Sequence, residues 1–251
     1  MEDNSGKGRS GFTEAVPTNA NDGCQSADLA SRYDHIYSRV DSSEHCPVST
    51  TSLTKARSRI RQVLGGFGLR SRIRGARVLD IGSGLGVTAE AFRELGATVT
   101  GMDLSPVAVA QAKARFDQID FRCKAFPEGL TEEDKFDLIW VVDLPIVGLF
   151  ETENIQATIL EPCLKQLKPD GHLIVGWHTN FSGRLTNGWM NWSLDSIREL
   201  RRVFRASPAL VPQARFFWLS ALVCQVCRLA RRSAPIYFCV RANAWRQGSA
   251  K

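Results

Sequence analysis

The sequence predicts a doubly wound α/β fold with a mostly parallel sheet, and three observations support this. An apolar strand at 78–81 runs into a glycine-rich turn, a second apolar run at 97–102 leads directly to an acid, and helix-forming segments separate these runs. Strands that alternate with helices in this way are typical of parallel βαβ units. The 251 residues, of which 43% are hydrophobic, are enough to bury one substantial core with additions around it.

The most informative stretch reads Val-Leu-Asp-Ile-Gly-Ser-Gly-Leu-Gly over residues 78–86. Glycine stands at every second position of the turn, so the backbone can approach a ligand closely. The amphipathic segment 88–95 then places a helix N-terminus below the turn, which favours a small polar ligand. A nicotinamide dinucleotide fingerprint needs its third glycine at position 87, where this chain has Val87, and the dinucleotide interpretation is therefore the weaker one.

An acid, Asp103, stands at the end of the second apolar run. In a nucleotide-binding α/β sheet the tip of this strand faces the same crevice as the glycine turn. A carboxylate in that place accepts hydrogen bonds from two ribose hydroxyls, so we expect Asp103 to bind a ribose. Ser105 and Pro106 then supply the cap and the first position of an alanine-rich helix over 105–115.

Later segments complete the predicted sheet. The run 135–143 predicts a buried strand that ends in Asp143, and 167–177 predicts a turn that leads into a further strand, with His178 just past its end. A helix is predicted at 194–204, and the last strand at 236–240.

The pattern Asp-x-Gly-x-Gly-x-Gly at 80–86 resembles the first motif of the class I S-adenosylmethionine (SAM) methyltransferases. The nearest resemblance is to the ubiquinone-pathway O-methyltransferases and their small-molecule relatives, and it is carried by residues 79–82, 101–103, 124–126 and 169–173. It implies a Rossmann-like, seven-stranded, mostly parallel sheet with N-terminal cap helices and, in this chain, a helical insertion before the last strand.

The resemblance implies that SAM is the cofactor and S-adenosylhomocysteine its product. The residues assigned to the cofactor are Asp80, Gly82, Ser83, Gly84, Gly86, Asp103, Leu104, Ala125, Phe126 and Asp143. Among them, Phe126 would pack against adenine, and Asp143 would lie beside the methionine end. No metal is expected, because residues 143–147 read Asp-Leu-Pro-Ile-Val where these relatives carry Glu-x-x-Glu-His.

A sulfonium methyl group is already activated, so its transfer depends more on alignment of the acceptor than on strong catalytic groups. Where a proton must leave the acceptor, His178 is the best-placed base of the four histidines, and Asp143 is the second catalytic candidate. The residues assigned to the acceptor are Tyr33, Tyr37, Trp177, His178 and Asn180. A structural His178, and tyrosines that only pack their helix on the sheet, stay open as alternatives.

The composition and the resemblance together divide the chain into five parts. These are a disordered polar tail at 1–26, N-terminal cap helices at 27–70, a SAM-binding core at 71–180, the C-terminal part of the core with an acceptor-lid insertion at 181–246, and a tail at 247–251. The insertion's apolar segment 216–232 ends in arginines and is too short to cross a bilayer, which needs about 20 apolar residues. An acceptor lid, a dimer surface and a peripheral membrane contact remain open for it, and we expect a monomer or a homodimer.

The net charge of +6 raises the question of a nucleic-acid partner, since basic surfaces attract phosphates. Much of the excess positive charge lies on arginines of predicted helices and no RNA-binding module is appended, so we do not expect a nucleic-acid partner.

The motif Cys224-Gln225-Val226-Cys227 lacks the second ligand pair that zinc needs. Scattered cysteines and the lack of an apolar leader after Met1 predict a cytoplasmic protein.

We therefore predict an enzyme that transfers a methyl group from SAM to an oxygen or nitrogen of a small molecule, with secondary metabolism as one setting for it. Two alternatives remain at this point. One is an RNA or protein methyltransferase, and the other is a catalytically silent SAM-fold binding protein.

Overall fold

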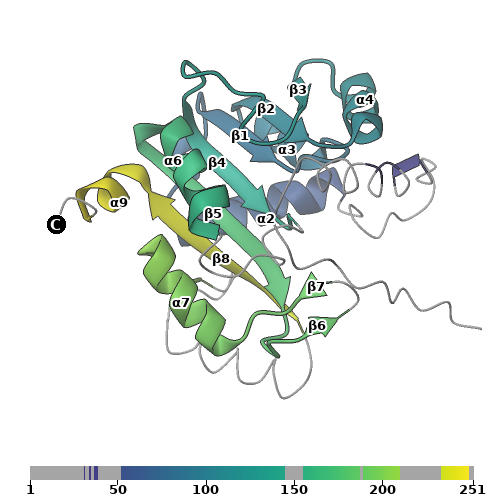
Figure 1. Cartoon of the computed structure of the whole chain (residues 1–251). Helices are drawn as coiled ribbons and strands as arrows, with labels where there is room; N and C mark the ends of the chain where they lie inside the picture. Colours follow the sequence, from purple (N-terminus) through teal and green to yellow (C-terminus); the bar gives the residue numbers. More distant parts are fainter. Residues whose placement is uncertain are drawn as a thin grey trace, which may run out of the picture.

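The computed structural model describes residues 31, 34, 37, 38, 52–144, 155–186, 189–209 and 233–248. In this part of the chain a six-stranded sheet forms the centre, in the order β3-β2-β1-β4-β5-β8 (Figure 1). Its strands are β1 (Arg77–Ile81), β2 (Thr98–Asp103), β3 (Asp120–Cys123), β4 (Phe136–Val142), β5 (Leu167–Thr179) and β8 (Ala234–Arg241). All neighbours are parallel except β8, which is antiparallel to β5. The predicted α/β class and the mostly parallel sheet are confirmed.

The resemblance implied seven strands, whereas the described residues place six in this sheet. At the free edge of β8, Ala209 pairs with Tyr237 through one antiparallel bridge. Two short strands, β6 (Leu185–Thr186) and β7 (Trp189–Met190), form a separate ribbon beyond the end of β5 (Figure 1).

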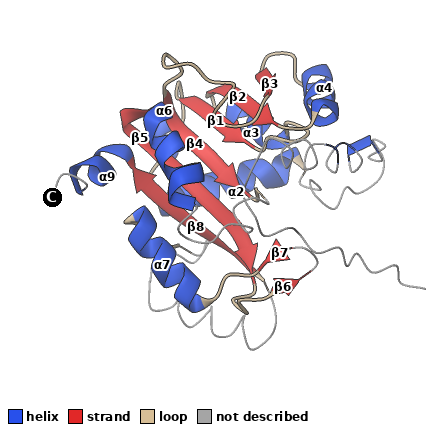
Figure 2. Ribbon diagram, in the orientation of Figure 1, coloured by secondary structure: helices blue, strands red, loops and turns tan. Residues whose placement is uncertain are grey.

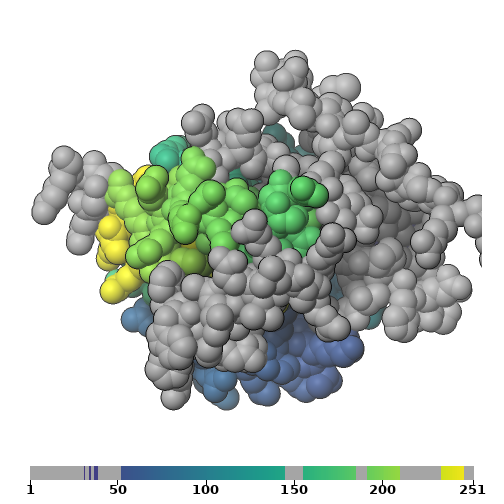
Figure 3. Space-filling model, turned by 90° about the horizontal axis from the view of Figure 1, so that it is seen from below, coloured from purple at the N-terminus to yellow at the C-terminus, as the bar shows by residue number. Residues whose placement is uncertain are grey.

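Helices cover both faces of the sheet (Figure 2). One face carries α2 (Leu53–Gly66), η1 (Arg70–Arg72), α3 (Val87–Glu94) and α4 (Pro106–Arg115). The other carries the π-helical turn η3 (Gln156–Leu160), α6 (Glu161–Gln166), α7 (Leu194–Phe204) and α9 (Ala242–Gly248). Seen from below, the green surface of α7 and the blue surface of the early helices lie on opposite sides (Figure 3). The strands are therefore buried on both faces, as parallel sheets require.

The helices predicted at 105–115 and 194–204 are confirmed, and each of the two has a serine as its cap. Ser105 Oγ accepts a hydrogen bond from the backbone N of Ala108 at 3.0 Å, and Pro106 follows as the first helical residue. Ser193 Oγ accepts from the backbone N of Ser196 at 3.0 Å at the start of α7. Each bond satisfies one of the donors that a helix leaves free at its N-terminus.

Helix α2 lies in the segment 27–70, for which cap helices were predicted, and a cover over the ligand crevice stays a prediction. Ile60, Val63 and Leu64 of α2 are buried in the core of the sheet's face, beside α3. The described residues of the preceding segment, by contrast, include Tyr37, which packs on Leu85 of the glycine turn.

Several predictions fall on residues that the structure does not describe. These are the tail at 1–26, Tyr33, the segment 216–232 with Cys224 and Cys227, and residues 249–251 of the C-terminal tail. Among the helices that are described, none has both the length and the apolar character needed to cross a membrane.

Candidate functional site

The glycine turn joins β1 to α3 at the carboxyl edge of the parallel strands. Gly82, Gly84 and Gly86 have φ of 75°, 50° and 78°, a region that L side chains rarely adopt. The backbone N–H groups of Gly82 and Ser83 donate to Met102 O at 2.8 and 3.0 Å. The turn is thus held by β2 in a shape that only glycine adopts without strain.

Two side chains lie against this turn. A Cβ atom on Gly84 would be 2.8 Å from Tyr37 Oη, and one on Gly82 would collide with Leu144 Cδ1. Tyr37 is buried and was predicted to contact the acceptor. The structure places it over the turn to which the cofactor was assigned, and its contact with the acceptor stays a prediction.

Asp103 stands at the tip of β2 and faces the turn. Its Oδ2 accepts a hydrogen bond from Gly84 N at 2.8 Å, and its Oδ1 accepts from Ser105 N at 2.9 Å. Burial raises the pKa of Asp103, and the nearby Asp34 adds to this, while the backbone donors act in the opposite direction. Asp34 also accepts a hydrogen bond from Ser105 Oγ, so the N-terminal segment is joined to the same edge.

Asp80, the last acid of β1 before the turn, is almost completely buried with 3% exposure. In the described part of the chain its Oδ2 atom has no hydrogen-bond partner, and neither has the buried Oγ of Ser83. Burial, with a contribution from Asp103, raises the pKa of Asp80 to about 8. Buried polar atoms are nearly always paired, so these two atoms mark a place where a ligand can supply the missing contacts.

The predicted adenine side of the site follows β2 and β3. Ala125 and Phe126 are half-buried, and Phe126 packs against the core cluster that includes Met102. Leu104 is half-buried as well, and its carbonyl accepts a hydrogen bond from Cys123 Sγ at 3.7 Å. These residues provide an apolar wall next to Asp103.

At the tips of β4 and β5 a second group of side chains meets. Asp143 has a φ of 57°, which is uncommon for a residue other than glycine. Its Oδ1 lies 3.2 Å from His178 Nδ1, and its Oδ2 accepts a hydrogen bond from Arg59 Nη1 at 2.7 Å. Burial would raise the pKa of Asp143, but the hydrogen bond from His178 and the charge of Arg59 outweigh it and lower the pKa to about 2. The two residues predicted to be catalytic therefore lie in contact.

The ionisation of Asp143 determines which tautomer His178 adopts. An ionised carboxylate only accepts hydrogen bonds, so Nδ1 of His178 carries the hydrogen and Nε2 remains free to accept a proton. The side chain of His178 is 49% exposed, and a substrate can therefore reach it. Among the described residues, no group of three or more His, Cys, Asp or Glu side chains is placed to hold a metal ion.

Arg59 and Tyr237 belong to this group although the sequence did not indicate them. Arg59 Nε donates to Tyr237 Oη at 2.7 Å, and the guanidinium lies 5.7 Å from the tyrosine ring centroid. Burial acts to lower the pKa of Arg59, but the stronger effect of Asp143 and Tyr237 raises it above its ordinary value. The guanidinium is therefore always charged. The sequence shows only that Arg59 stands directly before an apolar residue, Ile60. No spacing along the chain relates Arg59 to Asp143.

Two other predicted acceptor residues take structural positions. Trp177 is buried in the core, with its ring centroid 4.4 Å from that of Trp192 and 6.1 Å from that of Phe238. Asn180 Oδ1 accepts a hydrogen bond from Ser182 N at 3.0 Å and so stabilises the turn after β5. Neither contact involves His178.

The comparisons with known proteins agree with this arrangement. Residues 78–171 match the sequence model of the family described as methyltransferase domain. The ubiquinone biosynthesis O-methyltransferase of Rhodopseudomonas palustris (strain BisB5) is 31% identical over 128 residues, which cover 49% of this chain and 46% of that protein. The chain thus spans about half the length of the curated relatives that it matches.

Solved structures share the fold. The 1,6-didemethyltoxoflavin-N1-methyltransferase of Burkholderia thailandensis is 20% identical, with a TM-score of 0.58 over 91% of this chain and 92% of that chain. The magnesium protoporphyrin IX methyltransferase of Synechocystis is 15% identical, with a TM-score of 0.54 over 89% of this chain and 100% of that chain. The first was solved with S-adenosylhomocysteine bound and the second with SAM.

Proposed function

We propose, starting from the class I methyltransferase domain that residues 78–171 form, that the protein is a SAM-dependent methyltransferase acting on an oxygen or nitrogen of a small molecule. The observation that carries this proposal is the buried Asp80 next to the glycine turn and Asp103, because its Oδ2 has no hydrogen-bond partner among the described residues. A buried carboxyl group in this position matches a ligand that brings its own positive charge.

The residues present fit SAM. Asp103 would bind the ribose hydroxyls, and Phe126 would pack on the adenine. The backbone of the glycine turn would lie directly against the ligand. Asp80 would receive the positively charged methionine end, which supplies the hydrogen bonds that its Oδ2 lacks in the described part of the chain, and the assignment of Asp143 beside the same end stays a prediction. When bound, SAM supplies a methyl group on a positively charged sulfur.

His178 and Asp143 provide proton transfer for a hydroxyl acceptor. The Nε2 atom of His178 would take the acceptor's proton as the acceptor oxygen receives the methyl group that SAM would supply. Asp143 stays ionised, holds the imidazole in this tautomer through Nδ1, and stabilises the positive charge that the imidazole gains. Arg59 fixes Asp143 from the other side through its contact with Oδ2.

Support for a small acceptor comes from the names of the similar proteins. The curated relatives are named for ubiquinone biosynthesis, and a structural neighbour for a toxoflavin precursor. The choice between oxygen and nitrogen, and a role in secondary metabolism, are part of the proposal.

Purified protein incubated with methyl-tritiated SAM and a panel of phenols, hydroxy acids and amines tests the proposal. We expect labelled product with at least one acceptor class. We expect the label to be lost in Asp103→Asn but retained in Asp120→Asn, which removes an exposed carboxylate at the start of β3. Binding of S-adenosylhomocysteine without transfer to small molecules, RNA or protein would instead favour a silent SAM-binding protein.

A further inference from the structure

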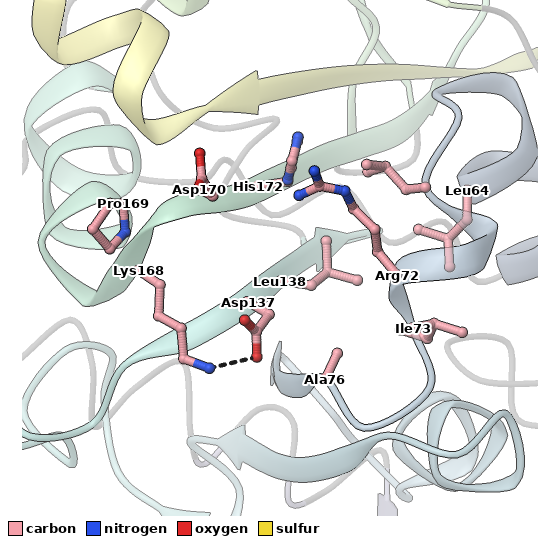
Figure 4. Close-up of a pocket in the computed structure, with 11 residues that line it drawn as sticks. Leu64, Arg72, Ile73, Ala76, Asp137, Leu138, Lys168, Pro169, Asp170 and His172 are labelled. Atoms are coloured by element: carbon pink, nitrogen blue, oxygen red, sulfur yellow. Dashed lines mark hydrogen bonds and ion pairs between the residues drawn. The ribbon is translucent and has the colours of Figure 1, made fainter.

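A cavity lies at the amino-terminal edge of the sheet, opposite the edge that carries the glycine turn. It has a volume of about 450 Å³ and opens between α2, η1 and the first residues of β4 and β5 (Figure 4). Asp137 near the start of β4 borders this cavity, while Asp143 beyond its end belongs to the site described above. Six residues of extended strand separate the two by roughly 20 Å. The cavity is therefore distinct from the glycine turn and from His178.

The cavity has an apolar floor and a polar rim. Buried aliphatic side chains of α2, of β4 and of the segment around η1 form the floor, and they are Leu64, Leu69, Ile73, Ala76 and Leu138. Charged and polar side chains form the rim, and they are Arg72, Asp137, Lys168, Asp170 and His172. A volume in this range, with apolar walls and a few polar groups, is typical of small-molecule sites.

The acids of the rim are already paired. Asp137 Oδ2 contacts Lys168 Nζ at 2.8 Å and accepts a hydrogen bond from Arg77 N at 2.8 Å. Asp170 Oδ1 contacts Arg241 Nη2 at 3.0 Å and accepts from Asn243 Nδ2 at 3.3 Å. The negative charges of the rim are thus neutralised by neighbours outside the floor.

Arg72 and His172 are the two side chains of the rim that do not take part in these pairs. Within the described part of the chain, neither the guanidinium of Arg72 nor the imidazole of His172 has a hydrogen bond or an ion pair. Figure 4 shows the guanidinium directed toward the imidazole along the rim. Burial lowers the pKa of His172, and the positive charges of Arg72 and Arg241 lower it further against the opposing effect of Asp170. The rim therefore carries a local excess of positive charge with free donors.

From this arrangement we propose that the cavity binds a small amphipathic anion. Its single anionic group lies between Arg72 and His172, and its apolar ring or short chain lies on the aliphatic floor. A charge-assisted hydrogen bond to Arg72 sets the position of the anionic group. Burial of the apolar body on Leu64, Ile73 and Leu138 distinguishes such a ligand from a simple ion.

Titration of sodium benzoate into the full chain, followed by NMR of the His172 imidazole, tests the proposal. We expect saturable shifts and a rise in the pKa of His172, because the bound anion offsets Arg72 and Arg241. In Arg72→Gln we expect binding to weaken about tenfold, as loss of one charge-assisted hydrogen bond implies. Arg74→Gln removes another exposed charge, which does not line the cavity, and should leave the affinity unchanged.

Comparison ligands separate the two parts of the site. Benzamide keeps the ring without the charge, while acetate and inorganic phosphate keep a charge without the ring, and all three should bind more weakly than benzoate. Equal binding of benzamide or of phosphate, or equal benzoate affinity in Arg72→Gln and wild type, would overturn the proposal. The readout does not depend on SAM, so its outcome is independent of the proposed methyl transfer.

Discussion

Asp143 Oδ1 lies 3.2 Å from His178 Nδ1, and these two side chains come from the ends of the neighbouring strands β4 and β5. The left-handed φ of Asp143 turns the chain directly after β4, and its backbone N donates to Gly176 O at 2.8 Å. Uncommon backbone conformations of this kind often occur at functional sites. The contact therefore gives the proposed reaction an oriented base.

Replacement of His178 by alanine should lower turnover with a hydroxyl acceptor by about 100-fold, the lower range for loss of a general base. The affinity for S-adenosylhomocysteine should stay unchanged, since His178 contacts neither the glycine turn nor Asp103. Added imidazole should restore part of the activity of this variant. Unchanged turnover across the pH range, or no rescue by imidazole, would assign His178 a merely structural role.

Arg59→Gln tests the support of Asp143. The pKa of Asp143 lies at about 2, below its ordinary value of 3.8, so its interactions stabilise the fold above pH 4 and are lost as the pH falls toward 2. Because Asp143 is partly exposed, we expect a loss of only about 1 kcal/mol in the free energy of unfolding at pH 7.

This difference between wild type and Arg59→Gln should shrink below pH 4 in denaturant titrations at several pH values. The matched control is Arg57→Gln, which removes a neighbouring arginine that contacts Glu94 at 2.8 Å instead of Asp143. Turnover should fall in Arg59→Gln and not in Arg57→Gln. A stability difference that is the same at pH 3 and pH 7 would contradict the role assigned to Arg59.

Asp80→Asn should make the free protein more stable at neutral pH. The pKa of Asp80 lies at about 8 in the fold, above its ordinary value of 3.8, so the folded protein holds a proton that the unfolded chain releases. The wild type therefore loses stability as the pH rises from 4 to 8, whereas the variant does not. Thermal unfolding of both proteins across this range measures the difference, and parallel curves would contradict a buried, protonated Asp80.

A related effect should accompany binding of the cofactor. A positive charge next to Asp80 favours the ionised carboxylate, so binding of SAM at pH 7 should release a proton from the wild type. Calorimetry in buffers with different ionisation enthalpies detects this release. Asp80→Asn should not show it, and equal proton release by both proteins would place the positive end of the ligand elsewhere.

Gly84→Ala should abolish most of the cofactor affinity, because the new Cβ would lie 2.8 Å from Tyr37 Oη at a φ of 50°. Gly75→Ala is the matched control, since its φ is 76° but nothing lies within 4 Å of the added atom. It should cost about 1 kcal/mol of stability from backbone strain and leave binding intact. Equal effects on binding in both variants would show that strain alone is responsible.

Local patterns in the sequence predicted most of the sheet and half of the site. The glycine turn, Asp103 and the helix caps depend on neighbouring residues, so their spacing along the chain was sufficient. Contacts between residues far apart in the sequence could not be predicted from local spacing. The contact of Arg59 with Asp143 joins residues 84 positions apart, and the burial of Trp177 depends on Trp192 from a later loop. The N-terminal helices predicted at 27–70 include α2, but the sequence did not specify which surface this helix covers.

Binding of S-adenosylhomocysteine by calorimetry, with wild type, Asp103→Asn and the control Asp120→Asn, tests the central claim most directly. The account predicts micromolar binding by wild type and Asp120→Asn, no binding of NAD, and affinity at least about tenfold weaker in Asp103→Asn, where a charge-assisted contact is lost. No binding by the wild type, or equal affinity in all three proteins, would contradict a SAM site at the glycine turn.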